Sequence, residues 1–190
     1  MMPIGALAVA LQPWQNFYVL VGTAAATLTG LMFVAVTFGS SLVTKETSES
    51  TRAFLDPPYL HFVQVLLTAC LVLMPTMSPG VLGVLLILVG GVRFVGLYTV
   101  FIRYREAQRA HGDIELSDWV LSIVLPLLCH LAIIATGAGF VAGDAAALTG
   151  LAAVSVILLF VGIHGAWELL VWMALAVSER RRGSPSPPAP

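Results

Sequence analysis

Five apolar stretches occupy most of this 190-residue chain, and each is long enough to cross a lipid bilayer. A spanning helix needs ~20 consecutive, mostly apolar residues. Hydrophobic residues make up 58% of the chain and charged residues only 10%, whereas a soluble domain typically carries ~25% charged residues. The sequence therefore predicts an all-α fold, an integral membrane bundle of five transmembrane helices in contact with the lipid bilayer.

The boundaries of the spans follow from aromatic, proline and polar residues. Trp14, Phe17 and Tyr18 resemble an interfacial aromatic belt at the start of the first span. Asp56 is a candidate cap for the second helix, and Asp144 for the fifth. We place the spans at about 14–43, 57–77, 81–103, 119–141 and 145–177. Together they form one domain over residues 14–178, between a short segment 1–13 and a Pro/Ser-rich tail 179–190 that we expect to be disordered.

Two local irregularities are also predicted. Pro126 lies inside the fourth span and removes the donor for the carbonyl of Ser122, so we expect a kink there. The triplet Ser78-Pro79-Gly80 and the pair Gly143-Asp144 indicate tight turns between consecutive spans.

The basic residues predict the orientation of the bundle. With five crossings, eight of the nine basic residues fall on one side, and the ninth, Arg93, lies inside a span. The eight are Lys45, Arg52, Arg103, Arg105, Arg109, Arg180, Arg181 and Arg182. The positive-inside rule then places the C-terminus in the cytoplasm and the N-terminus, with segment 1–13, outside.

Small residues at four-residue spacing mark one face of the first span, at Gly22, Ala26 and Gly30. Such faces allow close approach of two helices in lipid. Two interpretations stay open: packing within one bundle, or a seam for a homo-oligomer or for other membrane proteins.

Polar residues inside the spans are the candidate functional residues, because a charge at the bilayer centre is costly. Counting inward at helical rise places Arg93, His130, His164 and Glu168 at ~15 to ~21 Å from the cytoplasmic side. We predict that they form one polar cluster in which Arg93 pairs with Glu168.

The cluster has three interpretations. It is structural, with an ion pair and hydrogen-bonded histidines that fix helix packing; it is a channel or proton relay, since histidine titrates near neutral pH; or it ligates metal or haem. For the last, His130, His164 and Glu168 are weak candidates by residue type, with haem between the two histidines.

His61 and Gln64 form a second polar pair near the start of the second span. The neighbouring prolines favour an interfacial position for His61, so we rank this pair behind the main cluster.

Motifs of soluble enzymes are missing: there is no Gly-rich phosphate loop, GxSxG, HExxH or CxxC. We therefore lean away from an enzyme, and we predict no cofactor. The basic residues of the cytoplasmic side are interleaved with acidic ones, which argues against a nucleic-acid partner. Cys70 and Cys129 lie inside spans, where we expect small buried hydrophobes rather than a disulfide.

Two segments, WQNFYVLVGTAAATLTGLMFVAVTF and RAFLDPPYLHFVQVLLTACLVLMP, together resemble a group of small, uncharacterised bacterial multi-span membrane proteins. The resemblance covers about residues 14–75. It implies a multi-pass protein of the bacterial cytoplasmic (inner) membrane, and it implies no catalytic residues.

Three function classes follow. The first is a channel, transporter or proton pathway built on the polar cluster. The alternative is a regulatory or scaffolding protein that packs against partners through its small-residue face. The third is an intramembrane metal or haem redox protein.

Overall fold

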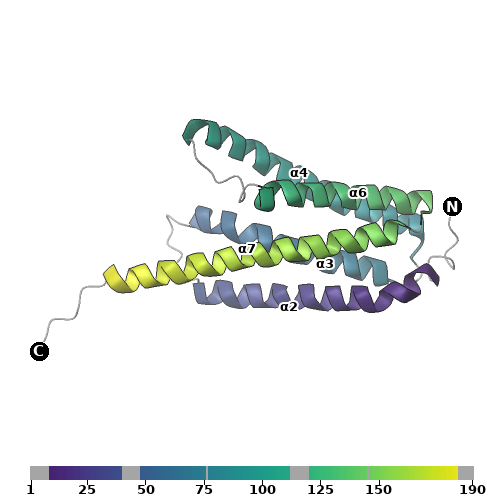
Figure 1. Ribbon diagram of the computed structural model, residues 1–190, viewed down its shortest axis with the longest axis horizontal. Helices are drawn as coiled ribbons and strands as arrows, with labels where there is room; N and C mark the ends of the chain where they lie inside the picture. Colours follow the sequence, from purple (N-terminus) through teal and green to yellow (C-terminus); the bar gives the residue numbers. More distant parts are fainter. Residues whose placement is uncertain (1–8, 40–47, 76, 112–119, 145, 184–190) are drawn as a thin grey trace, which may run out of the picture.

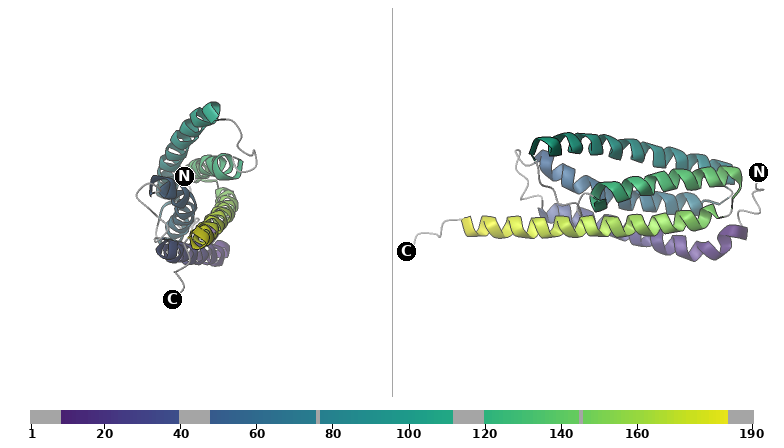
Figure 2. Two further views of the ribbon diagram at one scale, coloured as in Figure 1. Left: turned by 90° about the vertical axis from the view of Figure 1, so that its left-hand side faces the viewer. Right: turned by 45° about the horizontal axis from the view of Figure 1, so that its top comes forward.

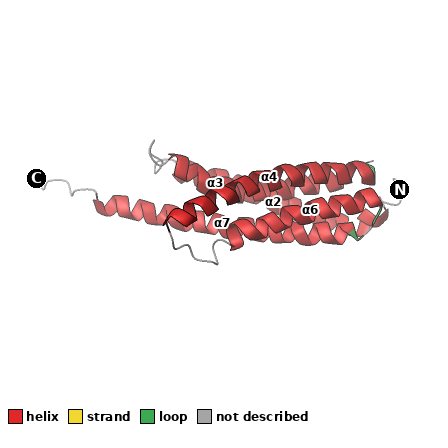
Figure 3. Ribbon diagram, turned by 90° about the horizontal axis from the view of Figure 1, so that it is seen from above, coloured by secondary structure: helices red, strands yellow, loops and turns green. Residues whose placement is uncertain are grey.

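The computed structural model describes residues 9–39, 48–75, 77–111, 120–144 and 146–183 (Figure 1). Five long α-helices make up this part of the chain, which confirms the all-α prediction. They are α2 (Gln15–Gly39), α3 (Ser48–Leu73), α4 (Pro79–His111), α6 (Leu125–Ala142) and α7 (Ala147–Gly183). A 3₁₀ turn, η1 (Gln12–Trp14), precedes α2, and a π-helical turn, η3 (Val120–Val124), precedes α6. The helices lie side by side along one axis (Figure 3).

Four segments are long and apolar enough to cross a membrane. They are Val9–Thr37, Pro79–Thr99, Leu125–Ala142 and Ala147–Leu175. The protein is therefore a multi-span helical membrane protein. The apolar part of α3, Pro58–Leu73, is shorter. At ~1.5 Å per residue it is ~24 Å long, against a hydrocarbon thickness of ~30 Å. The fifth crossing and the orientation stay predictions.

Helix α3 begins about nine residues earlier in the chain than expected, at Ser48. Asp56 therefore lies within the helix, and its prediction as the helix cap was wrong. The physical reason is the intrinsic helix propensity of the residues before it, which include Glu49, Arg52 and Ala53. The two prolines that follow lack backbone donors, yet the helix continues through them.

The helices form two groups in the end-on view of Figure 2. Helix α4 packs mainly against α6, while α3 packs between α2 and α7; contact between α6 and α7 joins the groups. Glycines bring α4 and α6 together. A Cβ atom added at Gly137 would lie 2.7 Å from the carbonyl oxygen of Gly83, and one at Gly90 would lie 3.3 Å from that of His130. Side chains larger than hydrogen would force the two backbones apart.

The chain reverses near both predicted turns, but the first turn lies before Pro79 and Gly80, which already belong to α4; α3 ends at Leu73. Ser78 Oγ accepts a hydrogen bond from the Val81 amide at 3.3 Å and so caps α4, which starts at Pro79. Helix α6 ends at Ala142 and is capped by Gly143, whose φ of 83° is left-handed. The amides of Gly143 and Asp144 bond back to the last turn of that helix. Asp144 Oδ1 then accepts from the Ala146 amide at 2.9 Å, ahead of α7.

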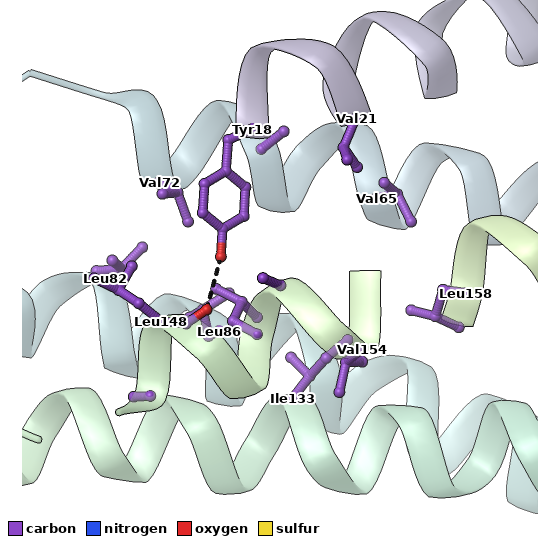
Figure 4. Close-up of a cluster of buried hydrophobic side chains, with 14 of the residues drawn as sticks. Tyr18, Val21, Val65, Val72, Leu82, Leu86, Ile133, Leu148, Val154 and Leu158 are labelled. Carbon is purple, nitrogen blue, oxygen red and sulfur yellow. Dashed lines mark hydrogen bonds between the residues drawn. The ribbon is translucent and has the colours of Figure 1, made fainter. Parts of the chain in front are cut away.

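The apolar core lies between all five helices and includes Tyr18, Leu86, Ile133 and Leu151 (Figure 4). Tyr18 is fully buried, and its hydroxyl donates to the carbonyl oxygen of Leu148 at 3.2 Å. Tyr18 therefore faces the other helices rather than lipid, and its ring ties α2 to the start of α7.

The two cysteines are free thiols in different surroundings. Cys129 is buried as predicted. Cys70 is exposed on the surface of the bundle, so the prediction of a buried side chain was wrong for it. Helix α3 directs His61, Gln64 and Thr68 towards the interior of the bundle, and Cys70 lies on the other side of the helix.

Candidate functional site

A polar stripe on α3 faces the interior of the bundle. His61, Gln64 and Thr68 lie on one face of the helix, at the spacing of residues that stack along successive turns. Their side chains are only 2–3% exposed. The stripe thus places imidazole, amide and hydroxyl groups in an environment that is otherwise apolar.

His130 on α6 lies opposite His61. Its side chain is fully buried, and the two ring centroids are 6.2 Å apart with the planes tilted by 41°. A direct N–H···N hydrogen bond of ~3 Å would require closer rings. The two imidazoles are therefore neighbours that are not hydrogen-bonded to each other.

The tautomer of His130 follows from its local hydrogen bond. Its Nδ1 lies 2.6 Å from the carbonyl oxygen of Pro126, one turn earlier on the same helix. Because a carbonyl oxygen can only accept, Nδ1 carries the hydrogen and donates. In the neutral ring, Nε2 is then left with a bare lone pair, and this atom is buried without a hydrogen-bond partner among the described residues.

The backbone around Pro126 is irregular where the sequence predicted a kink. The π-helical turn η3 (Val120–Val124) runs directly into α6, whose second residue is Pro126. Since proline has no N–H, the i→i−4 pattern is broken there. Wide turns of this kind occur frequently at functional sites, and this one ends at Val124, nearly two helical turns before His130.

Arg93 on α4 adds charge to this centre. It lies one turn after Gly90, whose backbone packs closely against the His130 carbonyl. Its positive charge acts electrostatically on both His61 and His130. Among the described residues, no carboxylate has a comparable influence on either ring. Arg93 thus adds a charged side chain whose field reaches both imidazoles.

Three buried atoms of the centre have no hydrogen-bond partner among the described residues: His61 Nδ1, Gln64 Nε2 and His130 Nε2. Leaving such an atom unpaired costs about 1–3 kcal/mol each. Native proteins rarely tolerate this without a reason such as a bound ligand or a catalytic role. We call His61, Gln64, His130 and Arg93 the polar centre.

His164 and Glu168 do not belong to the polar centre. Their side chains are 38% and 43% exposed, and they pair with each other, with 3.2 Å between His164 Nε2 and Glu168 Oε1. Gly162 and Gly165, on either side of His164, pack against Phe62 and Pro58 of α3. His164 therefore lies near the level of His61 but points outward.

The four residues that the sequence grouped are thus divided. The structure brings His130 and Arg93 together and turns His164 and Glu168 away from them. The ion pair found for Glu168 is with His164, not the predicted one with Arg93. Depth along a helix can be counted from the sequence, but the rotation of α7 about its own axis cannot.

The sequence ranked His61 and Gln64 second, although they line the polar centre. The expected interfacial position of His61 rested on the two prolines before it and on a helix that began there. A better signal was available: polar residues at positions 61, 64 and 68 share one helical face of an otherwise apolar segment.

The weak metal candidates are also divided. His130 lies inside the bundle, whereas His164 and Glu168 lie on its outer side. Within the part of the chain that the structure describes, no three His, Cys, Asp or Glu side chains are close enough to hold a metal ion together.

Comparison with known protein families, curated proteins and solved structures found no match to this chain. The family resemblance therefore gains no support beyond the multi-span architecture.

Proposed function

We propose that this protein is an ion-translocating membrane protein of the channel or transporter class, and that the polar centre is its ion site. The observation that carries the proposal is the set of unpartnered buried atoms on His61, Gln64 and His130. Ionisable groups within a bundle usually mark substrate, ion or proton paths, because hydrocarbon penalises them otherwise.

The geometry favours a species that passes between the two imidazoles. The ring centroids are 6.2 Å apart, so the imidazoles are not hydrogen-bonded to each other. The unpartnered nitrogen is Nδ1 in His61 on α3 and Nε2 in His130 on α6. An ion or a proton carrier between them would satisfy both nitrogens at once. The two rings would then act as successive binding sites along one translocation path.

Flux into proteoliposomes tests this function. We expect the wild-type protein to dissipate an imposed ion or pH gradient, and His61→Ala to lower the rate at least tenfold. His164→Gln is the matched control, since it alters a histidine at a similar level that points outward, and it should keep the wild-type rate. Equal rates for His61→Ala and wild type, or no wild-type flux, would exclude the proposal.

The proposed topology has the N-terminus outside and the C-terminus in the cytoplasm of the bacterial inner membrane. Two observations support an odd number of crossings. Helix α2 begins at one end of the bundle, and α7 ends at the other (Figure 1). Along the chain, the basic residues outside the apolar segments come after α2 and before the apolar part of α3, or after the apolar parts of α4 and α7. With helices that alternate in direction, these positions belong to the end of the bundle at which α7 ends.

A scaffolding role is the second candidate, and the small-residue face of α2 favours it. Gly22 packs within the bundle, where an added Cβ would lie 3.0 Å from that of Ala69. Ala26 and Gly30 are exposed, and no atom lies within 4 Å of a Cβ added at Gly30. Gly30→Leu should abolish a complex formed through this face without unfolding the bundle. An oligomeric state and partner set unchanged by Gly30→Leu would leave the face to lipid.

A further inference from the structure

We infer that the polar centre is an acid-triggered gate: protons taken up from solvent by His61 and His130 drive the helix pair α4 and α6 away from α2, α3 and α7. The movement occurs in the half of the bundle nearer the start of α6. This inference rests on the proposed function for its role as a gate, and it names how that site is regulated.

The two imidazoles meet across the boundary between the two groups of helices. His61 belongs to α3 and His130 to α6, and their ring centroids are 6.2 Å apart. The side chains are 2% and 0% exposed, and each ring has one nitrogen without a hydrogen-bond partner among the described residues. Neutral rings fit such a place at the cost of the unmade hydrogen bonds. The closed arrangement therefore depends on the two rings remaining neutral.

Protonation of both rings would place two positive charges close together in a medium of low dielectric. Such charges repel each other, and burial penalises each of them separately. Water relieves both penalties, because it solvates a charged imidazole and screens the repulsion. Separation of the two helix groups would admit water to both rings at once. Acid therefore favours the open arrangement, since rings in contact with water bind protons more readily than buried ones.

Among the described residues, the ionisable groups around the two rings include no carboxylate that would neutralise a protonated imidazole in the closed arrangement. On α4, Arg93 is positive and its field reaches both rings. On α6 and α2, the thiol of Cys129 and the phenol of Tyr18 are neutral at and below pH 7. On α7, Glu168 pairs with His164 on the outer side. Burial and the mutual repulsion of the rings suffice for opening, whatever Arg93 adds.

The other half of the bundle holds the two groups together through close contacts between α6 and α7, which join the groups (Figure 2). A Cβ added at Gly139 would lie 3.1 Å from that of Ala147, and one added at Gly150 would lie 2.9 Å from Thr136 Cγ2. These positions lie near the end of α6 and the start of α7. We therefore expect this half to act as the hinge.

Distances between paired spin labels, measured by double electron–electron resonance on the full chain in lipid nanodiscs, test the movement. Both native cysteines are replaced by alanine. Labels at Leu128→Cys and Val34→Cys report on the half that opens, and labels at Val141→Cys and Leu20→Cys report on the hinge half. All four positions are exposed, and each pair joins α6 to α2.

We expect a change from pH ~8 to pH ~5, the range in which histidine gains its charge, to lengthen the first distance and leave the second unchanged. Because opening takes up two protons, the ratio of open to closed molecules should rise by up to about a hundredfold per pH unit. A first distance that is the same at both pH values, or equal lengthening of both distances, would overturn the inference.

Variants identify the groups that take up the protons. His61→Gln and His130→Gln should each reduce the pH dependence to at most about tenfold per pH unit. The double variant should show none, and His164→Gln should behave like the wild type. If one single variant does not fold, the other single variant and the steepness of the wild-type transition still decide. Opening in acid that persists in the double variant contradicts the inference.

The gate and the proposed function fail in distinguishable ways. Opening in acid without ion flux in proteoliposomes at any pH would exclude the proposed function and leave the conformational switch standing. Flux with a first distance that does not change with pH would exclude the gate and leave the proposed function standing.

Discussion

His130 shows how one residue can have two distinct tasks. One ring nitrogen is committed to the carbonyl oxygen of Pro126, and the other is buried without a partner among the described residues. The first contact fixes the orientation of the ring, and the second leaves a reactive lone pair in the interior. A purely structural histidine would be expected to satisfy both nitrogens.

We predict that neutral His130 carries its hydrogen on Nδ1. The chain has four histidines, so ¹⁵N-histidine labelling with long-range ¹H–¹⁵N correlation gives a spectrum that single substitutions can assign. At high pH the His130 pattern should be that of the Nδ1–H tautomer. Assignment of His130 as the Nε2–H tautomer would contradict the hydrogen bond to the Pro126 carbonyl oxygen.

Gln64 tests whether the polar centre costs stability. Replacing an unpaired buried amide with an apolar side chain of similar size removes a desolvation penalty. We therefore expect Gln64→Leu to stabilise the protein by about 1 kcal/mol, seen as a higher midpoint in thermal unfolding. A clear loss of stability in Gln64→Leu would mean that the amide has a structural partner in the folded protein.

At the scale of the helix, the contact between α4 and α6 depends on glycine at particular positions. A Cβ at Gly137 would lie 2.7 Å from the Gly83 carbonyl oxygen and 3.1 Å from the Ile87 amide nitrogen, both backbone atoms. We expect Gly137→Ala to destabilise the protein by about 1–3 kcal/mol, because the backbones must separate. The measurement is thermal unfolding in detergent.

Gly91 supplies the matched control for that substitution. It lies on α4 with no atom within 4 Å of an added Cβ. Gly91→Ala should gain up to ~1 kcal/mol from helix propensity alone. Equal effects of the two substitutions would show that the α4–α6 contact is looser than the structure has it.

The elements of this fold could largely be predicted from the sequence, whereas their rotations could not. Apolar length and turn chemistry located the helices, and Ser78 and Asp144 make the local hydrogen bonds expected at helix starts. The direction of a side chain depends on which neighbour its helix packs against. In an apolar segment such as α7, nearly every face is hydrophobic, so no amphipathic pattern indicates that Glu168 points outward. On α3 the polar stripe does supply that pattern, and His61 follows it.

For the whole molecule, the open structural question is whether α3 crosses the membrane. Its apolar segment is short, but its polar stripe is buried against other helices rather than facing lipid. A helix enclosed by neighbours does not need the full apolar length that a lipid-facing helix needs. Local thinning of the bilayer can also accommodate a short segment at modest cost. We therefore predict five crossings.

Three single cysteines distinguish the topologies, each in a background of Cys70→Ala and Cys129→Ala. Gln12→Cys and Asp144→Cys are at exposed positions at one end of the bundle, and Gly183→Cys is at the end of α7. Five crossings with the N-terminus outside predict that an impermeant maleimide labels the first two in intact cells and spares the third. If α3 does not cross, Gln12 and Asp144 fall on opposite sides, and only one of them is labelled. Labelling of all three in permeabilised cells is the control for reactivity. Shared labelling of Gln12→Cys and Asp144→Cys would place every basic residue outside the apolar segments on the protected side, as the positive-inside rule requires.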